Sequence, residues 1–182
     1  MNLHFHPWHH INPDLDAAAT ITAVIEIAQG SKAKYEIDKT TGLLRLDRVL
    51  YGATHYPINY GIIPQTLGKD HDPLDALVIS QVPLEPLSQL RGRIVGVMRM
   101  VDNNEVDDKI ILAPIGDASL FHIKVIEDLP QHFFSEIKHF FEVYKQLENK
   151  KVVVQEFNGL SNALTIIKAA MDDYNKIICS KG

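Results

Sequence analysis

The chain has 182 residues, a formal net charge of −5 and one cysteine, Cys179. This length favours a single domain over residues 1–182, which can bury roughly 70% of the surface that its unfolded chain exposes. The charge argues against a general nucleic-acid binder, and one cysteine excludes an internal disulfide. Cys179 has no obvious base beside it, which argues against a catalytic thiol. The sequence shows no signal-peptide pattern and no run of roughly 18 apolar residues, so we expect a cytoplasmic protein without a membrane partner.

The first fifteen residues are rich in histidine. Histidines at positions 4, 6, 9 and 10 resemble a metal-binding tract, but a position near a chain end favours a mobile or surface-packed segment. We assign these histidines no role. Trp8 is a candidate anchor of residues 1–15 on the rest of the chain.

Strand patterns follow over most of the chain. In residues 21–27, isoleucine or alanine occupies every second position, which is the period of a strand, and Glu26 falls on the opposite face. Residues 34–48 predict a hairpin around a Thr41-Gly42 turn, with charged side chains on one face. Further strands are expected at residues 74–80, 93–101, 109–113 and 152–157.

Clear helical patterns come last. Apolar residues recur at spacings of three and four over residues 130–148 and again over residues 161–178, where Ser161 is a candidate N-cap. Strands followed by helices indicate an α+β domain, and we expect a closed or partly closed barrel with the helices packed outside.

The stretch "KDHDPLDALV" places three carboxylates, Asp70, Asp72 and Asp75, within six residues. Counted from Asp70, the fifth residue is Leu74 and the sixth is Asp75, where an EF-hand calcium loop needs an oxygen ligand and a glycine. The pattern therefore excludes an EF-hand. Pro73 prevents a regular helix here, and oxygen ligands on a short loop suit magnesium or manganese better than zinc. The loop by itself fits a solvated acidic turn equally well.

A second acidic stretch, "VDNNEVDDK", contains Asp102, Asp107, Asp108 and Lys109. Its Asn-Asn pair also suits an exposed hairpin turn. A turn at the rim of a barrel can still supply ligands, and two such loops would hold two metals about 4 Å apart, as in phosphoryl-transfer sites.

Seven segments occur in an order and spacing that resemble the soluble family I inorganic pyrophosphatases: "VIEI", "KYEIDK", "LDR", "YPINYG", "DHDPLDALV", "VDNNEVDDK" and "FFEVYKQLE". The resemblance covers about Glu26 to Glu156. It implies an OB-type five-stranded β-barrel with additional strands and two C-terminal helices outside. It also implies hydrolysis of pyrophosphate to two phosphates by in-line attack of a metal-bridged hydroxide. The implied cofactor is Mg²⁺, several ions per site, with Mn²⁺ or Zn²⁺ as substitutes.

The resemblance also implies roles, position by position. Asp70, Asp75 and Asp107 match ligands of the first pair of metals, and Glu26, Glu36 and Asp102 match carboxylates that serve further metals or their waters. Asp72 matches the general base, a role that suits a carboxylate between two ligand residues. Lys34, Arg48, Lys109 and Lys145 match phosphate contacts, and Tyr56, Tyr60 and Tyr144 match nearby hydroxyls. Arg48 and Tyr144 stand with Asp72 as the catalytic residues.

Some of these residues have structural alternatives. Tyr56 and Tyr60 also fit core aromatics in a turn, and Lys145 also fits a lysine that extends along an apolar helix face into solvent. We expect Asp108 to remain in solvent, because its neighbours already match the ligand role. His71 replaces the glycine or small polar residue usual between the first two loop aspartates.

The sequence also leads to an expectation about the oligomeric state and leaves two alternative functions open. The short length resembles the hexameric bacterial type; His139 matches one histidine of a subunit contact, whereas Val143 replaces the other. An OB-type barrel also suits a nucleic-acid-binding module, although a basic groove with stacking aromatics would then be needed. A divalent-metal buffer would use the same acidic loops but leave Lys34 and Arg48 without a purpose.

Overall fold

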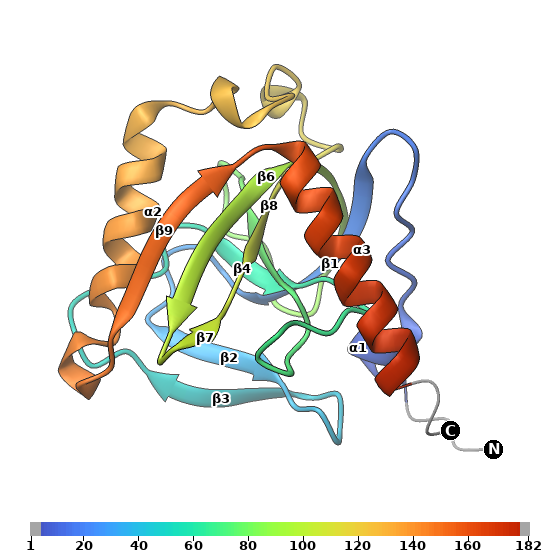
Figure 1. Cartoon of the computed structure of the whole chain (residues 1–182). Coiled ribbons are helices and arrows are strands. Elements are labelled where there is room, and N and C mark those ends of the chain that lie inside the picture. Colours follow the sequence, from blue (N-terminus) through green and yellow to red (C-terminus); the bar gives the residue numbers. More distant parts are fainter. Residues whose placement is uncertain (1–4, 179–182) are drawn as a thin grey trace.

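A five-stranded closed barrel forms the centre of the molecule (Figure 1). The computed structural model describes residues 5–178, so His4 and Cys179 lie outside the described residues. The barrel strands are β1 (Thr20–Ile27), β4 (Asn59–Ile62), β5 (Asp75–Val78), β8 (Lys109–Pro114) and β6 (Gln89–Asp102). They pair in that order, β6 closes the ring on β1, and only β5 and β8 are parallel. The predicted α+β fold with an OB-type barrel is confirmed.

The remaining strands extend the barrel or stand beside it. β7 (Glu105–Val106) and β9 (Val152–Asn158) both pair with β6. β2 (Ala33–Ile37) and β3 (Leu44–Val49) form the predicted hairpin, a separate two-stranded sheet drawn below the barrel in Figure 1. The sequence analysis missed β4 and β7, which are too short for an alternating pattern to stand out.

Two C-terminal helices pack outside the barrel, as predicted. α2 (Gln131–Val143) contacts β9 and α3 (Leu160–Ile177) contacts β6 (Figure 1). The predicted ends were partly wrong. α2 stops at Val143 because Lys145 leaves helical geometry, at φ −106° and ψ 3°. The N-cap of α3 is Gly159, so Ser161 lies inside the helix.

Three short 3-10 turns complete the elements: Ala118–Leu120, Ile126–Asp128 and Gln146–Glu148. Within residues 5–178, no helix has both the length and the apolar character needed to cross a membrane.

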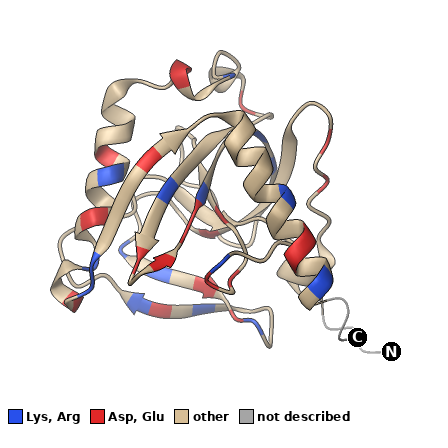
Figure 2. Cartoon of the chain, viewed as in Figure 1, with Lys and Arg blue, Asp and Glu red and all other residues tan. Residues whose placement is uncertain are grey.

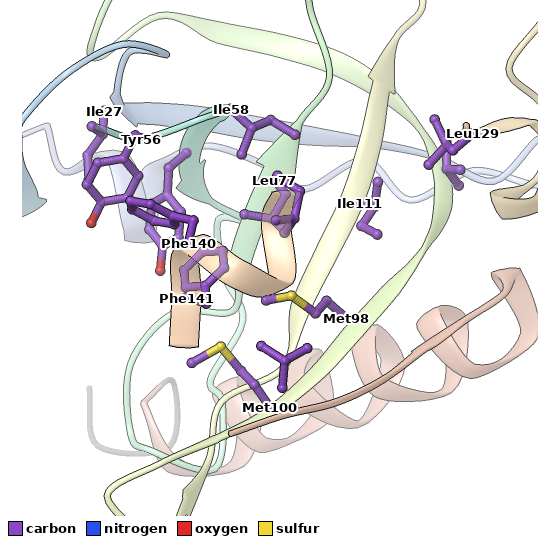
Figure 3. Close-up of a cluster of buried hydrophobic side chains, with 14 of the residues drawn as sticks. Ile27, Tyr56, Ile58, Leu77, Met98, Met100, Ile111, Leu129, Phe140 and Phe141 are labelled. Carbon is purple, nitrogen blue, oxygen red and sulfur yellow. The ribbon is translucent and has the colours of Figure 1, made fainter. Parts of the chain in front are cut away.

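The barrel strands β5 and β8 are buried on both faces. On β5 and β8, Leu77 and Ile111 join a cluster that includes Phe140 and Phe141 of α2 (Figure 3). Their neighbours Ala76, Val78, Ile110 and Leu112 join a second cluster, which includes Ala163 and Ile167 of α3. Burial on both faces explains why these strands read as continuous apolar runs. It also fixes the strand ends, from which the polar loops project.

The N-terminal segment is packed on the barrel. α1 (Pro7–His10) places Trp8 in a small core cluster with Tyr174 of α3, and the indole Nε1 donates to the carbonyl oxygen of Thr66 at 2.9 Å. The prediction that Trp8 anchors the N-terminal segment to the rest of the chain is therefore confirmed. For residues 5–15, the surface-packed alternative is the one that the structure shows.

Candidate active site

A cleft of about 590 Å³ opens between the β2–β3 hairpin, the loop before β5 and the β6–β7 turn. Most of the predicted site residues line it: Glu26, Lys34, Glu36, Tyr60, Asp70, Asp72, Asp75, Asp102, Asp107, Tyr144 and Lys145. Arg48, Tyr56 and Lys109 are not among the lining residues: Tyr56 and Lys109 are buried, and the Arg48 side chain is 17% exposed. Figure 2 shows basic and acidic positions mixed on β2 and β3, beside acidic positions at the ends of β6 and β7.

Glu26 reaches the cleft through a β-bulge. Ile25 pairs with Gly61 and Ile27 pairs with Tyr60, so Glu26 is an extra residue on β1. Its carboxylate is buried, 6% exposed, and accepts a hydrogen bond from the backbone N–H of Ile37 at 2.6 Å. Burial raises the pKa of Glu26 to about 8. Glu26 thus links the barrel to the hairpin and carries a proton near neutral pH when no cation is bound.

Lys109 lies under the floor of the cleft, only 1% exposed. Its Nζ donates to Asp75 Oδ2 at 2.5 Å, to Asp107 Oδ1 at 2.8 Å and to the hydroxyl oxygen of Tyr60 at 3.1 Å. Burial acts to lower the pKa of Lys109, but the carboxylates of Asp107 and Asp75 raise it well above its usual value. Burial raises the pKa of Asp75, and Lys109 opposes that shift. The floor is therefore a buried ammonium group between two ligand candidates.

A second bulge organises the cations of the hairpin. Lys34 pairs with Arg48 and Tyr35 with Leu46, so Asp47 is an extra residue on β3. Its carboxylate Oδ2 lies 3.1 Å from Lys34 Nζ and 2.5 Å from Arg48 Nη1. Lys34 also contacts Glu36. Burial acts to lower the pKa of Lys34, but Glu36 and Asp47 hold it above its usual value.

Arg48 connects the hairpin to the 3-10 turn Gln146–Glu148, which follows α2. Its Nε donates to Glu148 at 2.8 Å, whereas its Nη2 is buried and has no hydrogen-bond partner among residues 5–178. A buried guanidinium N–H without a partner is costly, so an anion beside it would be stabilised. Asp47 and Glu148 are polar neighbours of the site that the sequence analysis missed.

Lys145 and Asp102 form an ion pair across the cleft. The Lys145 side chain is largely buried, so the alternative in which it merely extends into solvent is wrong. Burial lowers the pKa of Lys145, against the effect of Asp102. The second carboxylate oxygen of Asp102, Oδ1, is buried without a hydrogen-bond partner in the described part of the chain.

The loop from Gly68 to Asp75 projects three carboxylates as an irregular turn. Gly68 N–H donates to the Asp72 carbonyl oxygen at 2.7 Å, and Asp70 Oδ1 accepts from the backbone N–H of Asp72 at 3.1 Å. Burial and the nearby Asp107 raise the pKa of Asp70 to about 6. His71 has a φ of +65°, a left-handed backbone conformation that glycine adopts more readily than other residues.

Asp108 is not in solvent, contrary to expectation. Its side chain is only 9% exposed, and its Oδ1 accepts from Arg99 Nε at 2.6 Å. The Asp108 side chain points away from those of Asp107 and Lys109 and contacts Arg99 on β6, a partner that the local sequence does not predict. The pair holds the residue next to a ligand candidate.

The three tyrosines differ in position. Tyr60 and Tyr144 line the cleft, and the hydroxyl of Tyr60 contacts Asp75. Tyr56 is buried behind them, with its ring 5.6 Å from that of Tyr60 and 4.9 Å from that of Phe140. The core-aromatic alternative therefore describes Tyr56, and Tyr60 combines a core ring with a hydroxyl at the site.

The cleft offers oxygen ligands already balanced by cations. Among residues 5–178, no three His, Cys, Asp or Glu side chains are gathered tightly enough to hold an ion unaided, and lysine ammonium groups lie against Asp75, Asp107 and Asp102. Carboxylate oxygens are nonetheless the ligands of hard divalent cations, and Asp102 Oδ1 has a free acceptor position. The donor set therefore fits such cations, and the lysines fit an anionic substrate.

Known proteins share this fold and much of this sequence. The inorganic pyrophosphatase family model matches residues 23–175. Soluble inorganic pyrophosphatase 5 of Arabidopsis thaliana is 47% identical over 173 residues, which cover 95% of this chain and 80% of that protein. The crystal structure of inorganic pyrophosphatase from Thermus thermophilus has a TM-score of 0.87 at 40% identity, covering 91% of this chain and 97% of that one. The enzyme from Helicobacter pylori gives 0.85 at 44% identity, over 91% and 99% of the two chains. The chain belongs to the inorganic pyrophosphatase family.

Proposed function

We propose that this protein hydrolyses inorganic pyrophosphate to two phosphates with Mg²⁺ as cofactor. The observation that carries the proposal is the lining of the cleft, which combines carboxylates suited to cations with the ammonium groups of Lys34 and Lys145, suited to phosphate oxygens. Phosphoryl transfer needs mainly positioning and charge stabilisation from a protein, and this cleft supplies both.

Family membership implies a divalent metal cofactor. Asp70, Asp75 and Asp107 would hold the first ions, and Glu26, Glu36 and Asp102 would hold further ions or their waters. Bound Mg²⁺ lowers the pKa of a coordinated water and offsets phosphate charge. Oxygen-only ligands favour Mg²⁺, with Mn²⁺ or Zn²⁺ as substitutes.

The chain's own residues would do the rest. Asp72, half exposed at the mouth of the cleft, takes the proton of the attacking water. Lys34, Lys109 and Lys145 would bind phosphate oxygens, and Arg48 would bind another through Nη2, which has no hydrogen-bond partner within residues 5–178. The hydroxyls of Tyr60 and Tyr144, which line the cleft, would orient these groups, and the buried Tyr56 would support the ring of Tyr60.

We also propose a cytoplasmic homohexamer without nucleic-acid or membrane partners. The Arabidopsis thaliana relative is named a soluble inorganic pyrophosphatase, and His139 is exposed on α2, where it is available to a second subunit. Sedimentation equilibrium measures the assembly, and a mass other than six times the 20.5 kDa chain excludes the hexamer.

Phosphate release from pyrophosphate tests the function. With Mg²⁺, the purified protein should release phosphate from pyrophosphate far faster than from ATP. Equal or faster hydrolysis of ATP would contradict the proposal. Metal binding without phosphate release would favour the metal-buffer alternative, and tight binding of single-stranded nucleic acid would favour the OB-type module.

A further inference from the structure

The tip of the β2–β3 hairpin reaches across the mouth of the cleft. Lys39, at this tip, lines the cleft, and its ammonium group contacts the carboxylate of Asp72. The same Nζ donates to the carbonyl oxygen of His71 at 3.3 Å. Lys39 thus bridges two elements that are far apart in sequence.

The N-terminal segment holds this tip from behind. His6 is 6% exposed, and its Nε2 lies 3.1 Å from the carbonyl oxygen of Asp38, next to Lys39. Its Nδ1 accepts from the backbone N–H of Trp8 at 3.2 Å, so the ring proton is on Nε2, which donates to Asp38. At Gly42, a Cβ atom would lie only 3.1 Å from His6 Cδ2, which shows how closely the tip packs on this segment.

Asp38, which contacts His6, also makes the hydrogen bonds that hold the turn at the hairpin tip. Its Oδ1 accepts from the backbone N–H groups of Thr40 and Thr41 at 3.1 and 2.8 Å, and its carbonyl oxygen also accepts from Gly42 N–H at 2.8 Å. The position of Lys39 within this turn is therefore fixed on both sides by hydrogen bonds to one residue.

The same segment also holds the other side of the bridge. Trp8 Nε1 donates to Thr66 O at 2.9 Å, and Thr66 Oγ1 accepts from the backbone N–H of Leu74 at 2.9 Å, inside the acidic loop. The contacts form a closed circuit from Lys39 to the loop, to Trp8, to His6 and back to the tip. Such a circuit fixes the distance between the hairpin tip and the loop that carries Asp72.

We propose that Lys39 is a further positioning residue of the active site and that the N-terminal segment, residues 5–10, holds it in place through His6. The inference rests on the proposed function, because Lys39 acts through Asp72. Its role is to orient that carboxylate and its loop, and not to bind phosphate.

Single variants separate these roles. Lys39→Ala should lower kcat about three- to ten-fold, the scale of one lost interaction, and leave KM within about two-fold. Lys39→Arg should retain most of the activity, since it keeps the charge and the reach. Lys138→Ala, an exposed lysine on α2, serves as the matched control. An unchanged kcat in Lys39→Ala, or a raised KM alone, would overturn the positioning role.

A double-mutant cycle tests the path through His6. His6→Ala should lower kcat, and the double variant with Lys39→Ala should be no slower than Lys39→Ala alone, because both changes break one circuit. Additive losses would overturn the path. His6→Asn provides a folded alternative, since asparagine keeps the N-cap of α1 but is too short to reach Asp38.

Amide hydrogen exchange tests these hydrogen bonds independently of catalytic activity. The amides of Thr40, Thr41 and Gly42 should exchange faster in His6→Asn and remain protected in His132→Ala, a change at an exposed histidine on α2. Unchanged protection in His6→Asn would overturn the holding role of the segment. A wild-type protein that releases no phosphate would reject the proposed function, whereas these exchange rates would still decide the circuit.

Discussion

Asp72 and Asp75 lie three positions apart on the acidic loop, but their surroundings differ. The Asp72 side chain is 51% exposed at the mouth, whereas that of Asp75 is largely buried against Lys109 and Tyr60. Asp72→Asn should therefore leave Mg²⁺ affinity within a few-fold and lower kcat by roughly 10², the scale of a lost general base. Asp75→Asn should weaken Mg²⁺ binding instead. Calorimetric metal titrations and steady-state rates measure the two effects.

The pH response separates the two roles again. Raising the pH should restore part of the Asp72→Asn activity, because hydroxide then forms without a base, and added Mg²⁺ should restore Asp75→Asn. If both variants lost metal affinity equally and responded alike to pH, the loop would be a simple chelating cluster.

Glu26 should make the metal-free protein less stable as the pH rises. Its pKa is about 8 in the folded chain, against 4.5 for an ordinary glutamate. Between these values the folded state binds more protons than the unfolded state, so the free energy of unfolding falls with increasing pH. Relative to Glu26→Gln, the wild type should lose more than about 1 kcal/mol between pH 5 and pH 8, since one pKa unit represents about that much.

Urea unfolding in chelator, at one fixed protein concentration, measures this difference. The comparison with Glu26→Gln cancels other groups, such as His9, whose pKa is lowered by burial and by the neighbouring His6 and His10. Parallel pH curves for the two proteins would show that Glu26 does not titrate in this range.

At the scale of single elements, the approach of β1 to β4 depends on Gly61. A Cβ atom there would lie 2.0 Å from the carbonyl oxygen of Val24. Gly61→Ala should therefore destabilise the fold by about 3 kcal/mol or more, because backbone atoms must move apart. Gly116→Ala is the control: a Cβ atom there meets nothing within 4 Å, and the change should stay within about 0.5 kcal/mol. Equal unfolding midpoints for the two variants would contradict the close packing.

The elements also show what a sequence can predict. Alternation and a Thr-Gly turn were enough for β1 and for the hairpin, and helical spacing was enough for α2 and α3. The bulges at Glu26 and Asp47 were not predictable, because a bulge depends on which residues face it across the sheet. The family resemblance identified Glu26 as a candidate site residue. Asp47 and Glu148 were identified only in the structure, by their contacts with Lys34 and Arg48.

Long-range contacts explain the other failures. Asp108 was expected in solvent because its neighbours matched the ligand role, and no sequence pattern links it to its partner Arg99 on β6. The role of residues 5–10 depends on contacts with Asp38 and Thr66, which lie far along the chain. Conversely, the acidic loop and the family segments predicted many residues of the cleft lining, because the candidate ligands within each segment are close in sequence.

For the whole molecule, we expect folding to be independent of metal. Lys109 and Lys145 already balance Asp75, Asp107 and Asp102 in the absence of any added cation. In chelator, the protein should keep a cooperative thermal transition, and Mg²⁺ should raise its midpoint by mass action, by about 2.7 kcal/mol at a hundred times Kd. Circular dichroism melts measure both. A chelated protein without a thermal transition would contradict this expectation.

The internal pairing of lysines with carboxylates also implies an order of events. A divalent cation that bound at Asp75, Asp107 or Asp102 would compete with an ammonium group tethered to the same chain, so its binding would exchange one cation for another. The displaced ammonium would stay tethered to the chain and would lose its counterion. Pyrophosphate would then meet a more positive site. Loading with metal would thus precede and promote loading with substrate, and the resting enzyme would keep its own positive charges occupied until the cofactor arrives.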